Sequence, residues 1–465
     1  MDTEEMKKQE VQASGPELQE RQKIEHPDRL LKSSLSGLES FGGFQMIKGL
    51  IKGVENMDPR KKAVKDIFLT ESTYADTRRK LKNELEVWIQ LLEGSATNPV
   101  EIIEACTEQR DKAEENLQTN LATIHEEIRK LEVAYRTLDS FFANAGQGRV
   151  ECLTLMNVNK QELKTSDSED TLAICDELAK HYDLLSLKNN YSLLVIPGQF
   201  GENDSLATTI RMWAKTAYKN KVIMVTDFRD VPEYPILKEL LEQSNLQGQD
   251  AYLANLIMTC NYLFGRKRSE QADEDDDLYI PGSAALAGRM SDTEEIVISQ
   301  GVAGTKYGTL NNVKGARLSL RKAEIASLID LGIIPMVESD GRTMAFSNRS
   351  LYNGATLGLQ EYPIVRVFDW IGKVFQHFFN AKAFENWDSK VKKELQDAIH
   401  AFLSGYKGPG ELFESYTLKK LEQDPVTKDI HVEVDIKPFF AAKNFFIELK
   451  GHNVDNTTEW EQNVQ

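Results

Sequence analysis

The chain has 465 residues, of which 56 are Lys or Arg and 73 are Asp or Glu, so its formal net charge is −17. Nucleic-acid phosphates repel such a surface unless a basic stripe offsets it, and the longest basic run is only Arg266-Lys267-Arg268. No stretch approaches the roughly 20 apolar residues of a membrane-spanning helix, and residues 1–30 lack a signal-peptide pattern. We therefore expect a cytoplasmic protein that neither binds nucleic acid by bulk charge nor inserts into membranes.

The N-terminal segment, residues 1–58, is predicted to be a flexible arm. Its first 33 residues are rich in Glu, Gln and Lys, with almost no large apolar side chains to offset the entropy of ordering. Apolar residues then recur at every third position among glycines, a period that drifts around an α-helix. Two interpretations stay open, a linker and an apolar arm that orders on a partner. The apolar positions are Leu35, Leu38, Phe41, Phe44, Ile47 and Leu50.

Two helices are predicted next, over about residues 60–92 and 99–144. Asp58-Pro59 supplies a capping side chain and a first-turn proline to the first helix. Apolar residues of the second helix alternate three and four positions apart, which gathers them on one face. This face, the apolar seam, is expected to pack on a neighbouring helix of this chain or another. The seam comprises Leu117, Leu121, Ile124, Ile128, Leu131, Tyr135, Leu138 and Phe142.

The period changes after Gly148, and residues 146–226 are predicted to be α/β. Strand, helix and strand at this spacing predict a βαβ crossover on a partly parallel sheet. The acidic run at residues 273–277 lacks the EF-hand spacing, which favours a solvated loop over a calcium site. The expected elements are strands over 150–158, 191–196 and 222–225 and helices over 171–182, 205–218 and 235–265.

The C-terminal region carries the clearest strand pattern. Apolar and polar residues alternate in two runs on either side of Pro438, which predicts one hairpin whose strands each bury one face. Two strands alone are marginally stable in water, so the hairpin must dock on its own domain or be completed by other strands. Its inward-facing residues are Val432, Val434, Ile436, Phe445, Ile447 and Leu449.

Local motifs of catalysis are not found. Gly304-Thr305-Lys306 lacks the phosphate-loop spacing, His125-Glu126 lacks the second zinc-binding histidine, and Gly282-Ser283-Ala284 is no nucleophile elbow. The four cysteines have neither zinc-site nor redox spacing. We expect no catalytic site, metal or cofactor; if the α/β region were an enzyme, its best acids would be Asp227 and Asp230, near the carboxyl ends of strands.

Several strings resemble, in order, the large subunit of the type VI secretion contractile sheath, the TssC or VipB family. The family's Leu-Glu-x-x-Trp-Arg-Gly-Leu string is similar to residues 131–138, and its Leu-Arg-Pro-His-Phe string to residues 436–440. Its Arg-Arg-Glu, Leu and Gly-Phe-x-Pro-Leu series resembles residues 318–336, where a helix is expected to end at Gly332 before a strand. A helix over 366–379 resembles its Arg-Phe-x-His-Tyr-x-Lys string. The substitutions indicate a divergent, Bacteroidetes-type branch.

The resemblance implies a mixed α/β (α+β) chain with a contractile tail-sheath-like fold. It implies a helical region over 59–145, a central α/β sheath domain over 146–350, and a C-terminal sheath domain over 351–465 with the terminal hairpin. In this family the large subunit pairs with a small sheath subunit, TssB or VipA. The pairs form a helical tube on a baseplate around an inner Hcp tube, and the tube contracts to propel Hcp.

The resemblance also implies roles for three sets of residues. Strands of neighbouring chains would complete the sheet of the C-terminal hairpin. The AAA+ unfoldase ClpV would grip residues 35–57. The apolar seam is the candidate contact with the small subunit, with internal packing as its alternative. A phage or tailocin sheath, which would assemble without a small subunit, and an α/β enzyme remain as other functions.

Overall fold

The computed structural model describes residues 72–77, 79–80, 83, 85–86, 99–146, 150, 152–199, 203–270, 274–442, 447–452 and 458–464. The chain divides into two units, Met1–Leu121 and Ala122–Gln465. In the first unit lie η3 (Ser72–Tyr74), helical residues between 75 and 86, and the start of α5 (Pro99–Asn144). The predicted helix over 99–144 is confirmed, and the arm over 1–58 lies outside the described residues.

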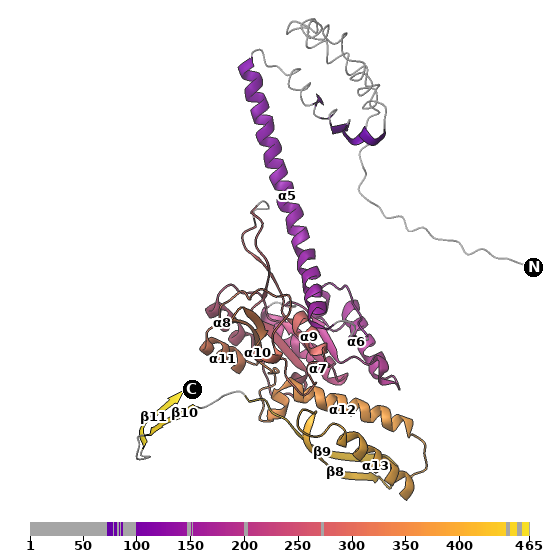
Figure 1. The fold of residues 1–465 in the computed structure, drawn as a ribbon. Helices are drawn as coiled ribbons and strands as arrows, with labels where there is room; N and C mark the ends of the chain where they lie inside the picture. Colours follow the sequence, from indigo (N-terminus) through magenta and orange to yellow (C-terminus); the bar gives the residue numbers. More distant parts are fainter. Residues whose placement is uncertain are drawn as a thin grey trace, which may run out of the picture. The chain divides into compact units, whose positions relative to one another are not determined.

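A five-stranded sheet forms the centre of the second unit, in the order β1-β2-β3-β6-β7 (Figure 1). Its first four strands are parallel, and β7 pairs antiparallel with β6. The predicted crossover is confirmed, because α7 connects the parallel neighbours β1 and β2. The strands are β1 (Leu193–Ile196), β2 (Ile223–Asp227), β3 (Leu256–Cys260), β6 (Ile333–Ser339) and β7 (Arg342–Ala345).

Helices cover this sheet, since β2 and β3 are buried at every residue, as parallel strands between two layers must be. Helix α9 packs against β1 and β2, α7 against β2, and α11 against β6. The helices are α6 (Glu169–Tyr182), α7 (Asn203–Lys219), α8 (Tyr234–Ser244), α9 (Ser283–Ser291), α10 (Gly304–Tyr307) and α11 (Lys322–Asp330). Single 3-10 turns are η4 (Glu162–Lys164), η5 (Leu187–Asn189), η6 (Ala251–Asn255) and η8 (Leu357–Gln360).

Two element predictions for this domain are wrong. Residues 152–158 form no strand, because their backbone joins no ladder. The helix predicted over 235–265 ends with α8, after which come η6, β3 and the antiparallel pair β4 (Leu263–Arg266) and β5 (Leu278–Ile280). β3 lies in mid-sheet and is apolar on both faces, so its residues show no alternation by which to distinguish it from a buried helix.

The end of α11 follows the predicted pattern. Gly332 has φ +73°, a conformation that glycine adopts without a steric penalty, and β6 begins at the next residue. A Cβ atom at this position would also lie 2.9 Å from the carbonyl oxygen of Ser350. A larger residue here would therefore strain both the helix end and the approach to the neighbouring loop.

The C-terminal domain has a separate hydrophobic core between α12 (Tyr362–Ala381), α13 (Ser389–Ser404), β8 (Phe413–Gln423) and β9 (Ile430–Pro438) (Figure 1). Trp370 of α12 stacks near Phe402 and Tyr406 in this core. α12 also contacts the central domain, because Lys373 Nζ donates a hydrogen bond of 2.6 Å to the carbonyl oxygen of Tyr191. α12 therefore packs in the C-terminal core and is also hydrogen-bonded to the central domain.

The predicted single C-terminal hairpin is wrong. β9 pairs antiparallel with β8, and β10 (Ile447–His452) pairs with β11 (Thr458–Val464). Local turn chemistry closes the first pair, because the Asp424 carboxylate accepts hydrogen bonds from the backbone N–H groups of Val426 (2.7 Å) and Thr427 (2.9 Å). Two successive two-stranded sheets therefore replace the one that the alternation suggested.

Candidate partner-binding helix and its ionic anchor

The C-terminal half of α5 docks on the central domain through the apolar residues Val133 and Phe141 and through small and polar side chains. Thr137 and Asn144 are buried, and the Asn144 side chain both donates to the backbone oxygen of Asn311 (3.2 Å) and accepts from its N–H (2.7 Å). α9 crosses closely here, since a Cβ atom at Gly288 would lie 2.3 Å from the carbonyl oxygen of Phe141. Glycine at this crossing is what allows the two helices to approach.

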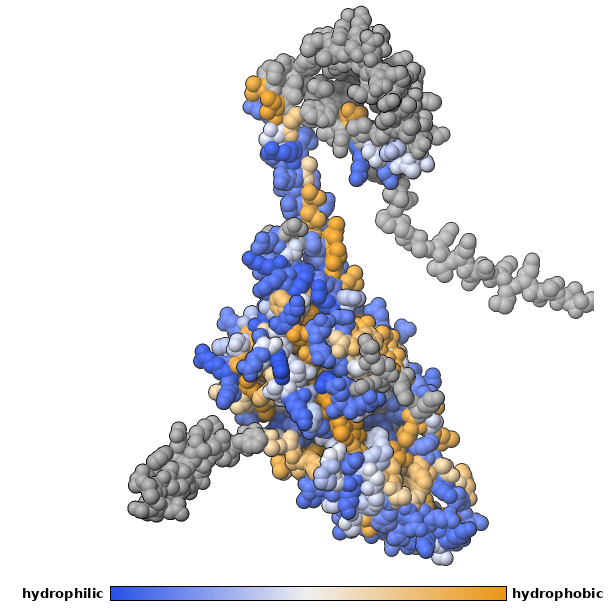
Figure 2. All heavy atoms as spheres, in the orientation of Figure 1, coloured by the Kyte–Doolittle hydropathy of each residue, from blue (hydrophilic) through white to orange (hydrophobic). Residues whose placement is uncertain are grey.

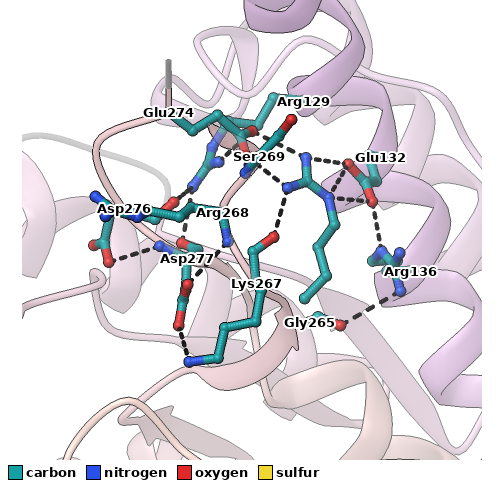
Figure 3. Close-up of polar contacts among 11 residues, drawn as sticks. Arg129, Glu132, Arg136, Gly265, Lys267, Arg268, Ser269, Glu274, Asp276 and Asp277 are labelled. Carbon is teal, nitrogen blue, oxygen red and sulfur yellow. Dashed lines mark hydrogen bonds and ion pairs between the residues drawn. The ribbon is translucent and has the colours of Figure 1, made fainter. Parts of the chain in front are cut away.

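Nearer its N-terminus, within the second unit, α5 is held by ion pairs to the β4–β5 hairpin (Figure 3). Arg129 Nη1 lies 2.7 Å from Glu274 Oε1, and Arg266 Nη1 lies 2.6 Å from Glu274 Oε2. Arg266 Nη2 also lies 2.8 Å from Glu132 Oε2. Arg136 Nε donates to Glu132 Oε1 at 2.8 Å. We call these five residues the ionic anchor.

Hydrogen bonds within the anchor stabilise its charged forms. Arg266, and then a backbone N–H and Arg129, hold the pKa of the Glu274 carboxyl far below its usual value of 4.5, although burial opposes this. Hydrogen bonds from Arg266 and Arg136 lower the pKa of Glu132 in the same way. Both carboxylates therefore stay ionised throughout the neutral range, so the anchor is a fixed set of charges.

The apolar seam lies on a different face of α5 from the anchor and is exposed. Leu131 and Tyr135 are each 71% exposed, and Figure 2 shows hydrophobic side chains along α5. Leu121 is half-buried. Within the described part of the chain the seam enters no core, so internal packing finds no support there, and contact with a small subunit remains a prediction. The other exposed members are Leu117, Ile124, Ile128, Leu138 and Phe142.

Three residues of the acidic run, Glu274, Asp276 and Asp277, contact α5 and are therefore not in a freely solvated loop. The Glu274 side chain is only 8% exposed, which corrects the prediction at this residue. Asp276 and Asp277 accept hydrogen bonds from Arg129 through their backbone oxygens. In the described ranges no group of three or more His, Cys, Asp or Glu side chains is placed to hold a metal ion.

The two acids of the enzyme alternative are both engaged in structural contacts. Asp227 is 1% exposed and accepts hydrogen bonds from the backbone N–H groups of Gly198 (2.7 Å) and Ser283 (2.9 Å) and from the hydroxyls of Thr259 and Ser283. Burial raises the pKa of Asp227. Asp230 Oδ2 lies 2.8 Å from Arg317 Nη1. These contacts use the oxygens that a catalytic acid or base would need.

The predicted C-terminal residues separate into two groups. Val432, Val434 and Ile436 pack against the core between α12 and α13, on the chain's own domain. Ile447 and Leu449 belong to β10, and Phe445 lies outside the described residues. The arm positions Leu38, Phe41, Phe44, Ile47 and Leu50 also lie outside them.

Sequence reasoning missed the ionic anchor. Arg266 was notable only within the longest basic run, and Glu274 only within an acidic run. One signal was available, because Arg129, Glu132 and Arg136 are spaced to share a second face of the helix, beside the seam. Their partners lie more than 100 residues away in sequence, so no local pattern could have named them.

The fold and this site define a mixed α/β protein with a long helix that exposes an apolar face. Models of the TssC/VipB family match nearly all of it: the type VI secretion system TssC/VipB central domain matches residues 123–353, the TssC/VipB-like C-terminal domain 361–465, and the TssC/VipB-like N-terminal region 31–121. The chain belongs to the TssC/VipB family and is a sheath subunit of a contractile secretion machine. Membership of this sheath family implies self-assembly into a helical sheath.

Several solved sheath structures are similar to this chain at low identity. The contracted helical sheath of the anti-feeding prophage shares 16% identity at a TM-score of 0.48, covering 68% of this chain and 81% of that one. The contracted sheath complex of PVC, an extracellular contractile injection system, shares 14% at 0.47, covering 69% and 80%. A sheath tail protein from Desulfitobacterium hafniense shares 14% at 0.37, covering 57% and 56%. No curated protein is a significant match.

The family is one of structural sheath proteins. None of the helices formed by the described residues is long and apolar enough to cross a membrane.

Proposed function

We propose that this chain is the large sheath subunit of a type VI secretion system, without catalytic activity or a cofactor of its own. In the cytoplasm it pairs with a small TssB/VipA-like subunit, and the pairs stack on a baseplate into a helical tube around Hcp. Contraction of the tube propels Hcp outward. The observation that carries this proposal is an exposed apolar helix face on a member of the TssC/VipB family.

The apolar seam is the proposed contact with the small subunit. Leu131 and Tyr135 are largely exposed, and exposing a continuous apolar face to water is unfavourable. Burying one such large side chain in an interface contributes about 1.5–3 kcal/mol before the costs of association. A helix of the small subunit with its own apolar stripe would fill the spaces between seam residues, as in two-helix packing.

The C-terminal strands are the proposed link between neighbouring pairs. β8 with β9, and β10 with β11, form two-stranded sheets in the described part of the chain, so each sheet has edges that can accept another strand. Each added backbone hydrogen bond contributes about 0.5–1.5 kcal/mol net. Because Val432 and Val434 already face their own core, added strands would join by backbone pairing at the edges.

Contraction needs no nucleotide in this proposal. Head-to-tail contacts that do not close on themselves generate a helix, and a helix sums small preferences over many subunits. A few kcal/mol per subunit, released as an interface changes between two packings, would drive the stroke. ClpV is proposed to recycle the contracted sheath by gripping residues 35–57.

Co-expression with the small protein encoded beside this chain tests the proposal. We expect the two proteins to copurify and to form tubes visible by electron microscopy. Leu131→Asp with Tyr135→Asp should abolish copurification, because both place a charge in the proposed interface. Lys130→Gln, on the same helix, is the matched control and should copurify normally.

Two outcomes contradict the proposal. Copurification that survives the seam double variant would remove the seam from the interface. Long tubes from this chain alone would favour a phage or tailocin sheath. Deletion of residues 1–57 tests the recycling role separately, and ClpV-dependent disassembly of the truncated sheath would show that the arm is not the handle.

A further inference from the structure

We propose that the ionic anchor is a positioning device: it fixes how α5 is rotated about its own axis, so that the apolar seam stays turned toward its partner. Glu274 is the central positioning residue. The inference rests on the proposed role of the seam and adds residues that lie outside the seam itself.

Glu274 acts as a hub because its two carboxylate oxygens accept four hydrogen bonds. Oε1 accepts from Arg129 Nη1 (2.7 Å) and Arg266 Nη2 (2.9 Å). Oε2 accepts from Arg266 Nη1 (2.6 Å) and the backbone N–H of Ser269 (2.6 Å). This number matches what an ionised carboxylate can accept, so the side chain is saturated in one orientation. Its place in the hairpin is thereby fixed relative to Arg129 on α5.

The helix side of the anchor covers two turns of α5. Arg129, Glu132 and Arg136 are spaced to share one face, and Figure 3 shows all three directed toward the hairpin. Arg129 donates to the backbone oxygen of Asp277 (2.9 Å), and Arg136 to that of Gly265 (3.5 Å). These two contacts lie two turns apart on α5 and reach the two strands' sides of one hairpin. Together they fix the rotation of α5 about its axis, which a single contact would not.

Charged groups can fix the rotation of α5 because their hydrogen bonds are directional. Apolar contacts are non-directional, so a helix held by them alone could roll its most apolar face onto the domain. The bonds from Arg266 to Glu132 and Glu274 are charge-assisted and in part bidentate, and these bonds have fixed geometry. Rolling α5 would separate partly buried charges from their partners, which is strongly unfavourable.

A second layer of contacts holds the hairpin in place. Arg317 pairs with both Asp230 and Asp276. Its guanidinium also lies 4.4 Å from the ring centroid of Tyr279 on β5. The backbone oxygen of Asp276 in turn accepts from Arg129. Through the hairpin, these contacts connect α5 to Asp230, which lies just after the end of β2. The orientation of α5 is thereby fixed relative to the central sheet.

Glu274→Gln in the full chain tests the inference, with Lys267→Gln as the matched control. Lys267 is in the same hairpin and pairs with Asp277 at 3.1 Å, but its side chain is 84% exposed and directed away from the anchor. Hydrogen–deuterium exchange of residues 122–136 in the chain alone should accelerate in Glu274→Gln and not in Lys267→Gln. Affinity for the small subunit should fall at least about fivefold, and more at high salt.

Arg129→Gln is a second, milder variant, because it leaves the Arg266 bonds to Glu132 and Glu274 in place. It should shift exchange and affinity in the same direction by less, and it keeps the test valid if Glu274→Gln fails to fold. Wild-type exchange and affinity in both soluble variants would overturn the inference. The exchange readout needs no partner, so failure of the wild-type chain to bind the small subunit would count against the proposed function alone.

Discussion

α5 and α12 are both long amphipathic helices, yet among the described residues α12 buries its apolar stripe and the seam of α5 is exposed. Val367 and Ile371 of α12 lie in the C-terminal core, whereas Leu131 and Tyr135 of α5 are exposed. A helical period of apolar residues therefore identifies an apolar face. It does not tell which molecule will cover it.

The residues outside each apolar stripe account for the difference. The first turns of α12 are buried all round, from Tyr362 to Val367, and such a helix has no choice but the interior. α5 instead carries Arg129, Glu132 and Arg136 outside its seam, and complementary charges on the β4–β5 hairpin bind them. The charged face of α5 therefore docks, while the seam is exposed in the described part of the chain.

The largest expected effect contrasts one apolar residue on each helix. Ile371→Ala should destabilise the chain by roughly 2–5 kcal/mol, because it leaves a cavity in a packed core. Leu131→Ala should change stability by less than about 0.5 kcal/mol, because the side chain is exposed. Urea unfolding of both variants measures this, and equal losses would erase the contrast between the helices.

The second prediction concerns pH and Lys373 of α12. Burial lowers the pKa of Lys373 from 10.5 to about 8, so the folded chain binds fewer protons than the unfolded chain between these values. The contribution of this lysine to stability therefore rises as pH rises through that window, by up to about 1.4 kcal/mol per pH unit. Below about pH 8 the difference between wild type and Lys373→Met should be constant.

Unfolding free energies of wild type and Lys373→Met on either side of pH 8 measure this effect. Lys390→Met, at a side chain that is 82% exposed, controls for general effects of alkaline pH. A difference between wild type and Lys373→Met that does not vary with pH would contradict the prediction.

A smaller effect is expected at the helix that covers α12. Asp388 caps α13, since its Oδ1 accepts from the backbone N–H groups of Lys390 and Val391, both at 2.8 Å. Asp388→Ala should cost about 0.5–2 kcal/mol, whereas Asp388→Asn should retain most of the stability. Thermal unfolding of the pair distinguishes loss of the cap from loss of charge.

The smallest effect is expected on the solvent side of α5. Lys130 Nζ lies 2.9 Å from Glu127 Oε1, but both side chains are more than 60% exposed, so solvent screens the pair. Lys130→Gln should leave the midpoint of urea unfolding unchanged. A clear decrease would mean that exposed ion pairs, and not only the partly buried anchor, hold α5.

Local patterns were reliable where one face or one turn decided the structure. The long helix over 99–144 follows from its three-and-four spacing, and the end of α11 from Gly332. The same reasoning failed at β3, where burial on both faces removes any alternation, and at the C-terminal strands. There the alternation identified strands correctly but not their partners, because several runs share the same period.

The amino-acid sequence was enough to identify the family, the alternation of helices and parallel strands, and the apolar stripe on α5. Each of these depends on residues close together in the chain or on strings in a fixed order. Three features could be read only from the folded structure: β9 pairs with β8, Glu274 is buried between Arg129 and Arg266, and the seam is exposed. The reason is physical: strand pairing and ion pairing depend on which distant segments the fold brings together, and no local period encodes that.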